Sequence, residues 1–340
     1  MNGGSTLAGE SAHASVPWQR QLAGAVRDVD ELWQLLALPA EALPAARAAA
    51  ATFPLLAPRS YVARMTPGRL DDPLLQQVLP VGKELLDVPG FTADPLEEGG
   101  CSPVPGLLHK YEGRALLVST AACAVHCRYC FRRHYPYHDV ARRGPWWRPA
   151  MDYLATQPSL DELLLSGGDP LTLPDAILEG IAADAEAIPH LRRLRFHTRL
   201  PVVLPERIDD GFLAFIARRR LAVVMVIHAN HAQELDGQVL DACRRLRAAG
   251  VTLLNQSVLL AGVNDDAATL AALSTRLFEA GVLPYYLHVL DHVAGAAHFL
   301  RSDADAVALH RELAARLPGY LVPRLVREEP GAPGKTPLTG

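Results

Sequence analysis

The chain has 340 residues, of which 49% are hydrophobic and 21% charged, and its formal net charge is -4. These values are typical of a globular protein with a substantial core, and they give no general attraction to nucleic acid or to an anionic membrane. The best apolar run, Leu221 to Ile227, is far shorter than the roughly 20 residues of a membrane helix. The N-terminus lacks the basic start and apolar stretch of a signal peptide, so we expect a cytosolic protein.

Residues 1–105 are predicted to form a helical region followed by a linker. The stretch from Trp18 to Leu56 is rich in Leu, Ala, Arg and Glu, with apolar residues at helical spacing, as at Leu32 and Leu36. Several prolines divide this region into short helices. Residues 89–105 are rich in glycine, proline and acidic residues, which favours a linker or a loop that crosses the core.

Beyond residue 105, apolar runs typical of strands alternate with amphipathic helical patterns. We expect strands at 115–119, 162–166, 194–198, 222–227, 252–260 and 284–289. We expect helices at 147–157, 174–188, 207–219, 233–249, 267–280 and 303–316. Six such alternations predict a parallel sheet with helices outside, and continuous apolarity predicts strands buried on both faces.

Six units are too few for a closed barrel of eight. The chain is therefore predicted to have an α/β fold in the form of a partial (βα)6 barrel. This core spans residues 106–300 and is followed by a C-terminal helix and a short lysine-containing segment at 301–340.

Three of the five cysteines lie within eight positions, in the segment Cys123-Ala-Val-His-Cys127-Arg-Tyr-Cys130 after the first predicted strand. An odd number of cysteines in a reducing compartment argues against disulfides and for metal binding or catalysis. Thiolates suit iron–sulfur clusters or zinc. A closed zinc site needs four ligands, and without a second Cys-x-x-Cys motif His126, His134 or a distant cysteine would have to complete it.

The pattern Cys-x-x-x-Cys-x-aromatic-Cys after a first strand resembles the signature of the radical S-adenosylmethionine (SAM) superfamily. The resemblance implies that Cys123, Cys127 and Cys130 bind three irons of a [4Fe-4S] cluster, whose fourth iron is left for SAM. It also implies that Tyr129 lies near the SAM adenine, and that a protein such as flavodoxin or ferredoxin supplies electrons.

The segment Ser166-Gly167-Gly168-Asp169-Pro170 follows the second predicted strand. Gly-Gly and Asp-Pro are typical of a β-turn, but two glycines also let a backbone approach a ligand closely, and Asp169 can accept a hydrogen bond from an ammonium group. The segment resembles the part of radical SAM proteins that contacts the SAM amino group. Both motifs follow strands, where ligands bind in parallel α/β folds.

Lys335 lies in the terminal segment Pro330-Gly-Ala-Pro-Gly334-Lys335-Thr336-Pro337. A phosphate-binding P-loop would need glycine in place of Glu329 and a helix afterwards. A solvated tail lysine is the default interpretation. However, a lysine amine can also bind pyridoxal phosphate (PLP) covalently, and a tail shaped by proline and glycine is more than a frayed end needs.

Over nearly its whole length the chain resembles the lysine 2,3-aminomutases. The resemblance implies that Lys335 carries PLP. The matching segments are 103–111, 123–133, 166–171, 198–205, 260–265 and the terminal Gly-Lys-Thr-Pro.

The same resemblance implies further roles. Tyr111 and Arg114 match residues around the PLP phosphate, although Arg114 can equally be an exposed charge at a strand start. Arg132 matches the arginine that binds the substrate carboxylate, a task for which a planar bidentate donor is suited; otherwise it is a surface arginine or a partner of the cluster. Asp291, otherwise a cap or turn residue, matches a carboxylate that receives the substrate side-chain ammonium. Glu328 stands where the family has a second such carboxylate, an aspartate.

Three histidines, His197, His228 and His231, are expected at strand ends, and we assign them no catalytic role. The segments Trp18-Gln-Arg-Gln-Leu and 58–65, with the short stretch after Lys335, resemble the compact branch of the family that serves elongation factor P. That branch converts (S)-α-lysine to (R)-β-lysine, which a synthetase-like ligase attaches to the translation factor. The chain is therefore predicted to be an isomerase that acts on lysine.

Three alternatives remain. An aminomutase for another amino acid such as glutamate would be expected to have a cationic far pocket, against which Asp291 and Glu328 argue. In a radical SAM enzyme without PLP, Lys335 would be only a tail residue. The third alternative is a non-enzymatic zinc or electron-transfer protein.

Overall fold

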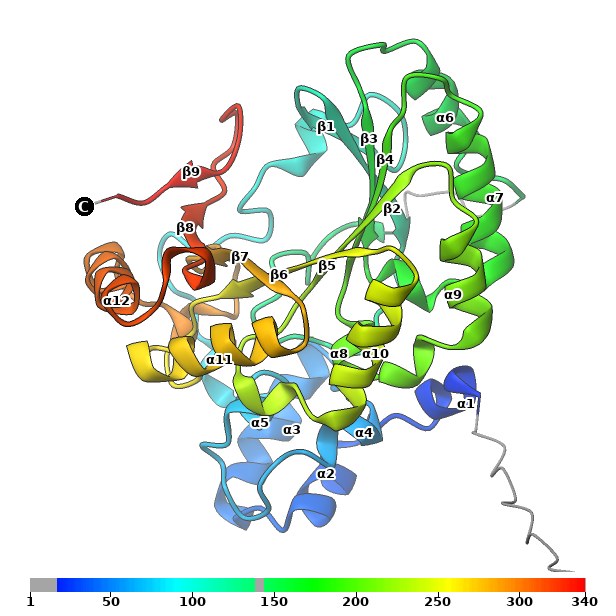
Figure 1. The fold of residues 1–340 in the computed structure, drawn as a ribbon. Coiled ribbons are helices and arrows are strands. Elements are labelled where there is room, and N and C mark those ends of the chain that lie inside the picture. The colour runs from blue at the N-terminus through cyan, green and yellow to red at the C-terminus, as the bar shows by residue number, and fades with distance from the viewer. Residues whose placement is uncertain (1–16, 138–143, 340) are drawn as a thin grey trace, which may run out of the picture.

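A computed structural model describes residues 17–137 and 144–339 of the chain. Within these residues nine strands form one sheet, in which each strand pairs with the next in sequence order (Figure 1). The strands are β1 (Leu107–Tyr111), β2 (Arg114–Thr120), β3 (Glu162–Gly167), β4 (Arg193–Thr198), β5 (Ala222–Ile227), β6 (Thr252–Val258), β7 (Leu283–His288), β8 (Arg324–Arg327) and β9 (Thr336–Pro337).

The sheet is an open barrel. Strands β2 to β8 are parallel to one another, whereas β1 and β9 pair antiparallel with β2 and β8 and, in the described part of the chain, form the two edges. The six predicted strands are β2 to β7, so the prediction of a partial α/β barrel is confirmed. The seventh parallel strand, β8, was missed because four residues, Arg-Leu-Val-Arg, are too short for a periodic pattern.

Helices cover the outside of the sheet (Figure 1). The predicted helices correspond to α6 (Arg148–Ala155), α7 (Asp175–Glu186), α9 (Asp210–Ala217), α10 (Gly237–Ala248), α11 (Ala267–Glu279) and α12 (Asp303–Arg316). Four of them begin after an Asp or Ser whose side chain accepts a hydrogen bond from a first-turn amide. Such caps satisfy backbone donors that the helix cannot. The predicted starts agree for α11 and α12, whereas those for α9 and α10, at 207 and 233, lie before the observed starts at Asp210 and Gly237. No helix in the described residues is long and apolar enough to cross a membrane.

From residue 17 on, the N-terminal region contains five short α-helices, α1 (Trp18–Ala23), α2 (Val29–Leu36), α3 (Leu43–Thr52), α4 (Arg59–Val62) and α5 (Pro73–Gln76). Helices α2 to α5 gather at one end of the sheet, at the bottom of Figure 1. Backbone hydrogen bonds from His126 to Leu56 and from Arg128 to Gln77, each 2.9 Å long, tie this region to the cysteine segment. The helices share one hydrophobic cluster with the barrel.

The expectation of strands buried on both faces is right for β3 and wrong for β4 and β6. All six residues of β3 are buried, whereas buried and partly exposed positions alternate along β4 and along most of β6. The inward side chains of Arg195, His197 and Gln256 are partly exposed because they line a cavity of about 530 Å³. The inside of the barrel is therefore a chamber that polar side chains help to line, rather than packed core.

Candidate active site

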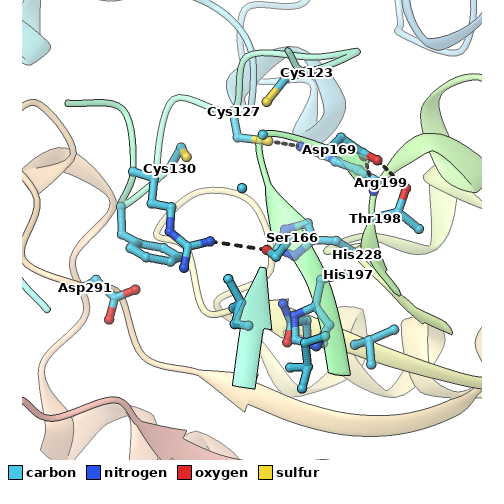
Figure 2. A pocket seen from close by; sticks show the side chains of 18 of the residues that line it. Cys123, Cys127, Cys130, Ser166, Asp169, His197, Thr198, Arg199, His228 and Asp291 are labelled. Atoms are coloured by element: carbon cyan, nitrogen blue, oxygen red, sulfur yellow. Dashed lines mark hydrogen bonds between the residues drawn. The ribbon is translucent and has the colours of Figure 1, made fainter. Parts of the chain in front are cut away.

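The cavity brings together all of the residues predicted to bind the cluster, SAM, PLP or the substrate. Cys123, Cys127 and Cys130 line it, together with Lys335 from the other end of the sequence. Figure 2 shows the three cysteines on the loop after β2, with Ser166 and Asp169 from the end of β3 and with Asp291 on another wall. The remaining predicted residues that line the cavity are Tyr111, Arg114, Tyr129, Arg132, Gly167, Gly168 and Glu328.

The two glycines after β3 position the cysteine loop. Gly167 has φ +115°, and a Cβ there would lie 2.6 Å from the carbonyl oxygen of Thr120. A Cβ on Gly168 would lie 2.3 Å from the carbonyl oxygen of Ala122, the residue before Cys123. Amides of Gly168 and Asp169 donate to Thr120 and Ala122 over 2.7 and 2.8 Å. The absence of side chains at Gly167 and Gly168 thus allows a close approach of the backbone that leads into the cysteines.

Substituting Gly168 with alanine is expected to displace the cysteine loop. Its Cβ clashes with backbone, which cannot rotate away, so the variant should lose about 1–3 kcal/mol of unfolding free energy and much of its iron. Urea unfolding and iron analysis after anaerobic reconstitution measure both. Gly237→Ala is the matched control, because a Cβ there meets nothing within 4 Å. Full iron loading of Gly168→Ala would contradict this account.

Asp169 has a structural task at the same corner. Its Oδ1 accepts hydrogen bonds from Thr198 Oγ1 at 2.7 Å and from the Leu171 amide at 3.0 Å, and its Oδ2 accepts from the Arg199 amide at 2.7 Å. Burial raises the pKa of this carboxyl, and the bond from Thr198 acts in the opposite direction. Asp169 therefore joins the end of β3 to the end of β4, so its carboxylate is already engaged before any ligand binds.

The three thiols suit a multi-iron cluster. All three cysteines are unpaired and partly buried, and burial together with the neighbouring Cys127 raises the pKa of the Cys130 thiol to about 12. The pKa of Cys123 is also raised by burial, and a bound iron ion would favour the thiolate forms of Cys123 and Cys130. Within the described residues no three His, Cys, Asp or Glu side chains converge on a point that one metal ion could fill. In an iron–sulfur cluster each iron takes one thiolate, and three cysteines on one loop match that donor set.

Tyr129 and Arg199 form a buried network beside the cysteines. The Tyr129 hydroxyl lies 2.8 Å from His228 Nε2 and receives hydrogen bonds from Arg199 Nη1 at 2.9 Å and from Asn230 Nδ2 at 2.7 Å. The same Arg199 nitrogen lies 2.9 Å from Cys127 Sγ (Figure 2). In the sequence, Arg199 is distinguished only by its place in the matching segment 198–205 and by its position at the end of a predicted strand. Neither feature predicts a contact with a cysteine.

Arg132 is held by a carboxylate that sequence analysis missed. Its Nε and Nη2 donate to the two oxygens of Glu98 over 2.6 and 2.7 Å, and its Nη1 lies 3.2 Å from Ser166 Oγ. Glu98 is buried and lies in the segment predicted as a linker or crossing loop, which here crosses over the cavity. Nothing in its local sequence distinguishes it from a solvated acid.

A chain of ion pairs extends from Glu98 to Lys335. Lys110 Nζ lies 3.0 Å from Glu98 and 3.3 Å from Glu328, and Glu328 also pairs with Lys335. Burial alone would raise the pKa of Glu328, but Lys335 and Lys110 hold it well below its usual range. Lys335 is thus an anchored cavity residue with a side chain 19% exposed, which is unlike a solvated tail lysine.

Asp291 faces the same cavity but has no hydrogen bond or ion pair recorded for its carboxylate in the described structure. Burial and the charge of Glu328 raise its pKa to about 7, while Lys335 and Lys110 act in the opposite direction. A carboxyl with a raised pKa in a cleft, without a cation of its own, is suited to receive a cationic group from a ligand.

The part of the cavity around Lys335 contains polar atoms without partners. His197 Nε2 and His288 Nε2 are buried, and neither finds a hydrogen-bond partner among the described residues. Burial, with Lys335 among the lesser causes, lowers the pKa of His288 to about 3 and that of His197 well below its usual range, so both imidazoles are neutral. The Arg114 guanidinium lies over the Tyr111 ring, 4.3 Å from its centroid, in the same cavity. A polar, anionic ligand such as PLP fits these residues.

An open parallel barrel in which the first parallel strand leads into a Cys-x-x-x-Cys-x-x-Cys loop, facing a large cavity, is the arrangement that the resemblance to radical SAM enzymes predicted. No protein-family model matches the chain. Curated relatives do match it. The L-lysine 2,3-aminomutase of Escherichia coli is 53% identical over 322 residues, which cover 94% of each chain. That of Haemophilus influenzae is 46% identical with the same coverage, and that of Clostridium subterminale is 34% identical over 94% of this chain and 77% of its own.

The chain belongs to the lysine 2,3-aminomutase family and is an isomerase. Among solved structures, a radical SAM methyltransferase from Sphaerobacter thermophilus is 21% identical with a TM-score of 0.45, over 65% of this chain and 68% of its own. This likeness is too distant to add to the sequence relationship.

Proposed function

We propose that the protein converts (S)-α-lysine to (R)-β-lysine by 2,3-amino migration, with a [4Fe-4S] cluster, SAM and PLP. The observation that carries the proposal is that one cavity is lined by the cysteine loop, by Lys335 and by the acids Asp291 and Glu328. The reduced cluster and SAM supply a 5′-deoxyadenosyl radical, and PLP supplies a conjugated system that delocalises an unpaired electron. The protein's contribution is to hold, orient and shield the reactants.

The cofactor sites follow from residues around the cavity. Cys123, Cys127 and Cys130 would each ligate one iron, and the loop after β3 (Ser166 to Asp169), with Tyr129, would border SAM. Lys335 would carry PLP, with Tyr111 and Arg114 near its phosphate. The unpartnered nitrogens of His197 and His288 support a polar group at this place, because buried polar atoms otherwise find partners.

Arg132 would bind the substrate carboxylate. Since Glu98 occupies Nε and Nη2 from one side, the other edge of the guanidinium, where Nη1 points toward Ser166, remains for a ligand. An arginine fixed in this way loses little freedom on binding, which strengthens carboxylate recognition. Glu98 is thus a positioning residue in this proposal.

The distal pocket is acidic, which favours lysine over glutamate. Glu328 keeps its charge through Lys335 and Lys110, and Asp291 lacks a recorded cation. A lysine ammonium that enters this pocket would meet the carboxyl groups of Asp291 and Glu328. A glutamate side chain would instead meet two like charges.

Lysine binding is expected to depend on the ionisation of Asp291. Because its pKa is raised to about 7, the carboxyl is mostly protonated below that pH and ionised above it. Affinity for lysine should therefore weaken by up to about tenfold for each pH unit below 7 and change little above pH 8. Calorimetric titration between pH 6 and 9 measures this.

Asp291→Asn should bind lysine weakly and lose this part of the pH dependence. Asp152→Asn, an exposed change on α6, is the control and should behave like the unaltered protein. If the pH dependence survives in Asp291→Asn, another group governs binding.

The proposed reaction is tested by anaerobic turnover of cluster-reconstituted protein with dithionite, SAM, PLP and (S)-α-lysine, followed by chromatography for β-lysine. Formation of β-lysine supports the proposal. Cleavage of SAM to 5′-deoxyadenosine without β-lysine would remove free lysine as the substrate and favour another amino acid or a lysine attached to protein. PLP that neither binds nor is required would favour the radical SAM enzyme without PLP.

We also place the enzyme in a pathway in which a ligase transfers the β-lysine to elongation factor P in the cytosol, with flavodoxin or ferredoxin as the electron donor. Support comes from the segments that resemble the compact branch, Trp18-Gln-Arg-Gln-Leu and 58–65. Intact-mass analysis of elongation factor P from cells without the gene tests this. A modification that persists there would contradict the pathway.

A further inference from the structure

We propose that Arg199 raises the reduction potential of the cluster by donating a charged hydrogen bond to the sulfur of Cys127. The inference rests on the proposed cluster at the three cysteines. It assigns a redox-tuning role to a residue that binds neither SAM, PLP nor substrate in the proposed function.

The guanidinium is in direct contact with the sulfur. Arg199 follows β4 and is 5% exposed, and its Nη1 lies 2.9 Å from Cys127 Sγ (Figure 2). Cys130, in contrast, receives a neutral donor, the backbone amide of Arg132. Cys127 therefore lies within hydrogen-bond distance of a guanidinium nitrogen, whereas Cys130 accepts a hydrogen bond from a peptide amide and has the charges of Arg132 and Arg133 nearby.

Other hydrogen bonds hold the guanidinium in place. Its Nη2 donates to Glu234 Oε2 at 2.8 Å, to Gln77 Oε1 at 2.5 Å and to the Tyr61 hydroxyl at 3.1 Å. Glu234 is fully buried, and its other oxygen accepts from the amide of Asn230 at 2.7 Å and from Gln77 Nε2 at 3.2 Å. The donor to the sulfur is thus fixed from two sides, by the barrel and by the N-terminal region.

This geometry has a predictable electrostatic consequence. Reduction adds an electron to a cluster that already carries the negative charge of its thiolates. A hydrogen bond to a ligand sulfur stabilises the reduced state more than the oxidised state, and so raises the reduction potential. A cation acts in the same direction, and it acts strongly here because little water screens the buried pair. The carboxylate of Glu234 partly offsets it.

A purely structural role makes a different prediction. If Arg199 only neutralises Glu234, its removal destabilises the fold without a specific effect on the cluster, because a buried charge is left unpaired. The electrostatic role predicts shifts of opposite sign for the two partners. Loss of Arg199 lowers the potential, and loss of the Glu234 charge raises it.

The test is a redox titration of the reconstituted protein monitored by electron paramagnetic resonance, without SAM. In Arg199→Met the midpoint potential should fall by the equivalent of at least a tenfold change in the one-electron equilibrium, about 59 mV. In Glu234→Gln it should rise, and Arg199→Lys, which keeps the charge, should lie between Arg199→Met and the unaltered protein. Arg64→Lys is the control, because Arg64 donates to the carbonyl oxygens of Glu234 and Val202 but not to a sulfur.

If Arg199→Met does not fold, Arg199→Met/Glu234→Gln leaves no buried charge unpaired, and its potential is compared with that of Glu234→Gln. The potential of the double variant must be lower than that of Glu234→Gln. Unchanged potentials in variants with full iron and sulfide content overturn this inference and leave the proposed function intact. A reconstituted wild-type protein without a cluster overturns the proposed function, and this inference with it.

Discussion

Replacing Cys127 with alanine is expected to reduce SAM cleavage by at least roughly a thousandfold, equivalent to about 4 kcal/mol of activation free energy. The proposed cluster loses one of its three cysteine ligands. We expect no other side chain to replace that ligand, because all three lie on one loop. The fold should survive, because Arg199 Nη1 keeps its 2.9 Å bond to the Tyr129 hydroxyl after the sulfur is removed. Iron analysis and 5′-deoxyadenosine formation measure the effect.

The control is Cys243→Ala, which removes a buried thiol in α10 far from the proposed chemistry. It should retain iron and activity and lose only modest stability. Cleavage of SAM by Cys127→Ala at the rate of the unaltered protein would refute the assignment of the three cysteines, because a cluster with only two cysteine ligands is not expected to be fully active.

Replacing Lys335 with alanine is expected to lower β-lysine formation by roughly a hundredfold or more, about 2.7 kcal/mol. A covalent attachment point for PLP is lost, and with it the pyridoxal absorbance of the purified protein. Glu328 is not left without a partner, because Lys110 Nζ remains 3.3 Å away. Loss of activity is therefore not expected to result from unfolding.

The variant Lys335→Arg separates covalent chemistry from charge. Arginine can maintain the ion pair with Glu328, but it does not form a Schiff base under these conditions. Both variants should lose the absorbance, and both should retain SAM cleavage at the cluster. If Lys335→Arg is as active as the unaltered protein, Lys335 acts only as a cation, and the alternative without PLP becomes the better description.

Local patterns were sufficient for much of the barrel. Strands β2 to β7 and the six outer helices follow from apolar runs and amphipathic patterns, because these depend on neighbours within a few positions. The cysteine spacing likewise indicates its chemistry without a structure. Strand β8 was missed because a four-residue strand carries too little periodicity, although it extends the sheet toward the segment that contains Lys335.

The glycines were expected to let the backbone approach a ligand closely, whereas the close neighbour in the structure is the backbone of Thr120 and Ala122. Gly168 lies against the carbonyl oxygen of Ala122, so the two motifs are parts of one corner rather than independent ligand contacts. The alternation of buried and partly exposed residues along β4 and β6 was likewise recognised only in the structure. Whether an inward position is packed or faces a chamber depends on the curvature of the whole sheet, which apolarity does not encode.

The sequence by itself determined the class of fold. It also indicated the cysteine loop and Lys335 as candidate functional residues. Only the tertiary structure decided which charges meet. Glu98 pairs with Arg132 across 34 positions, and Arg199 reaches Cys127 across 72. Such pairs form where loops from different strands converge over an open barrel. Their partners are selected by three-dimensional proximity and by the cost of leaving a buried charge alone, and neither leaves a local pattern.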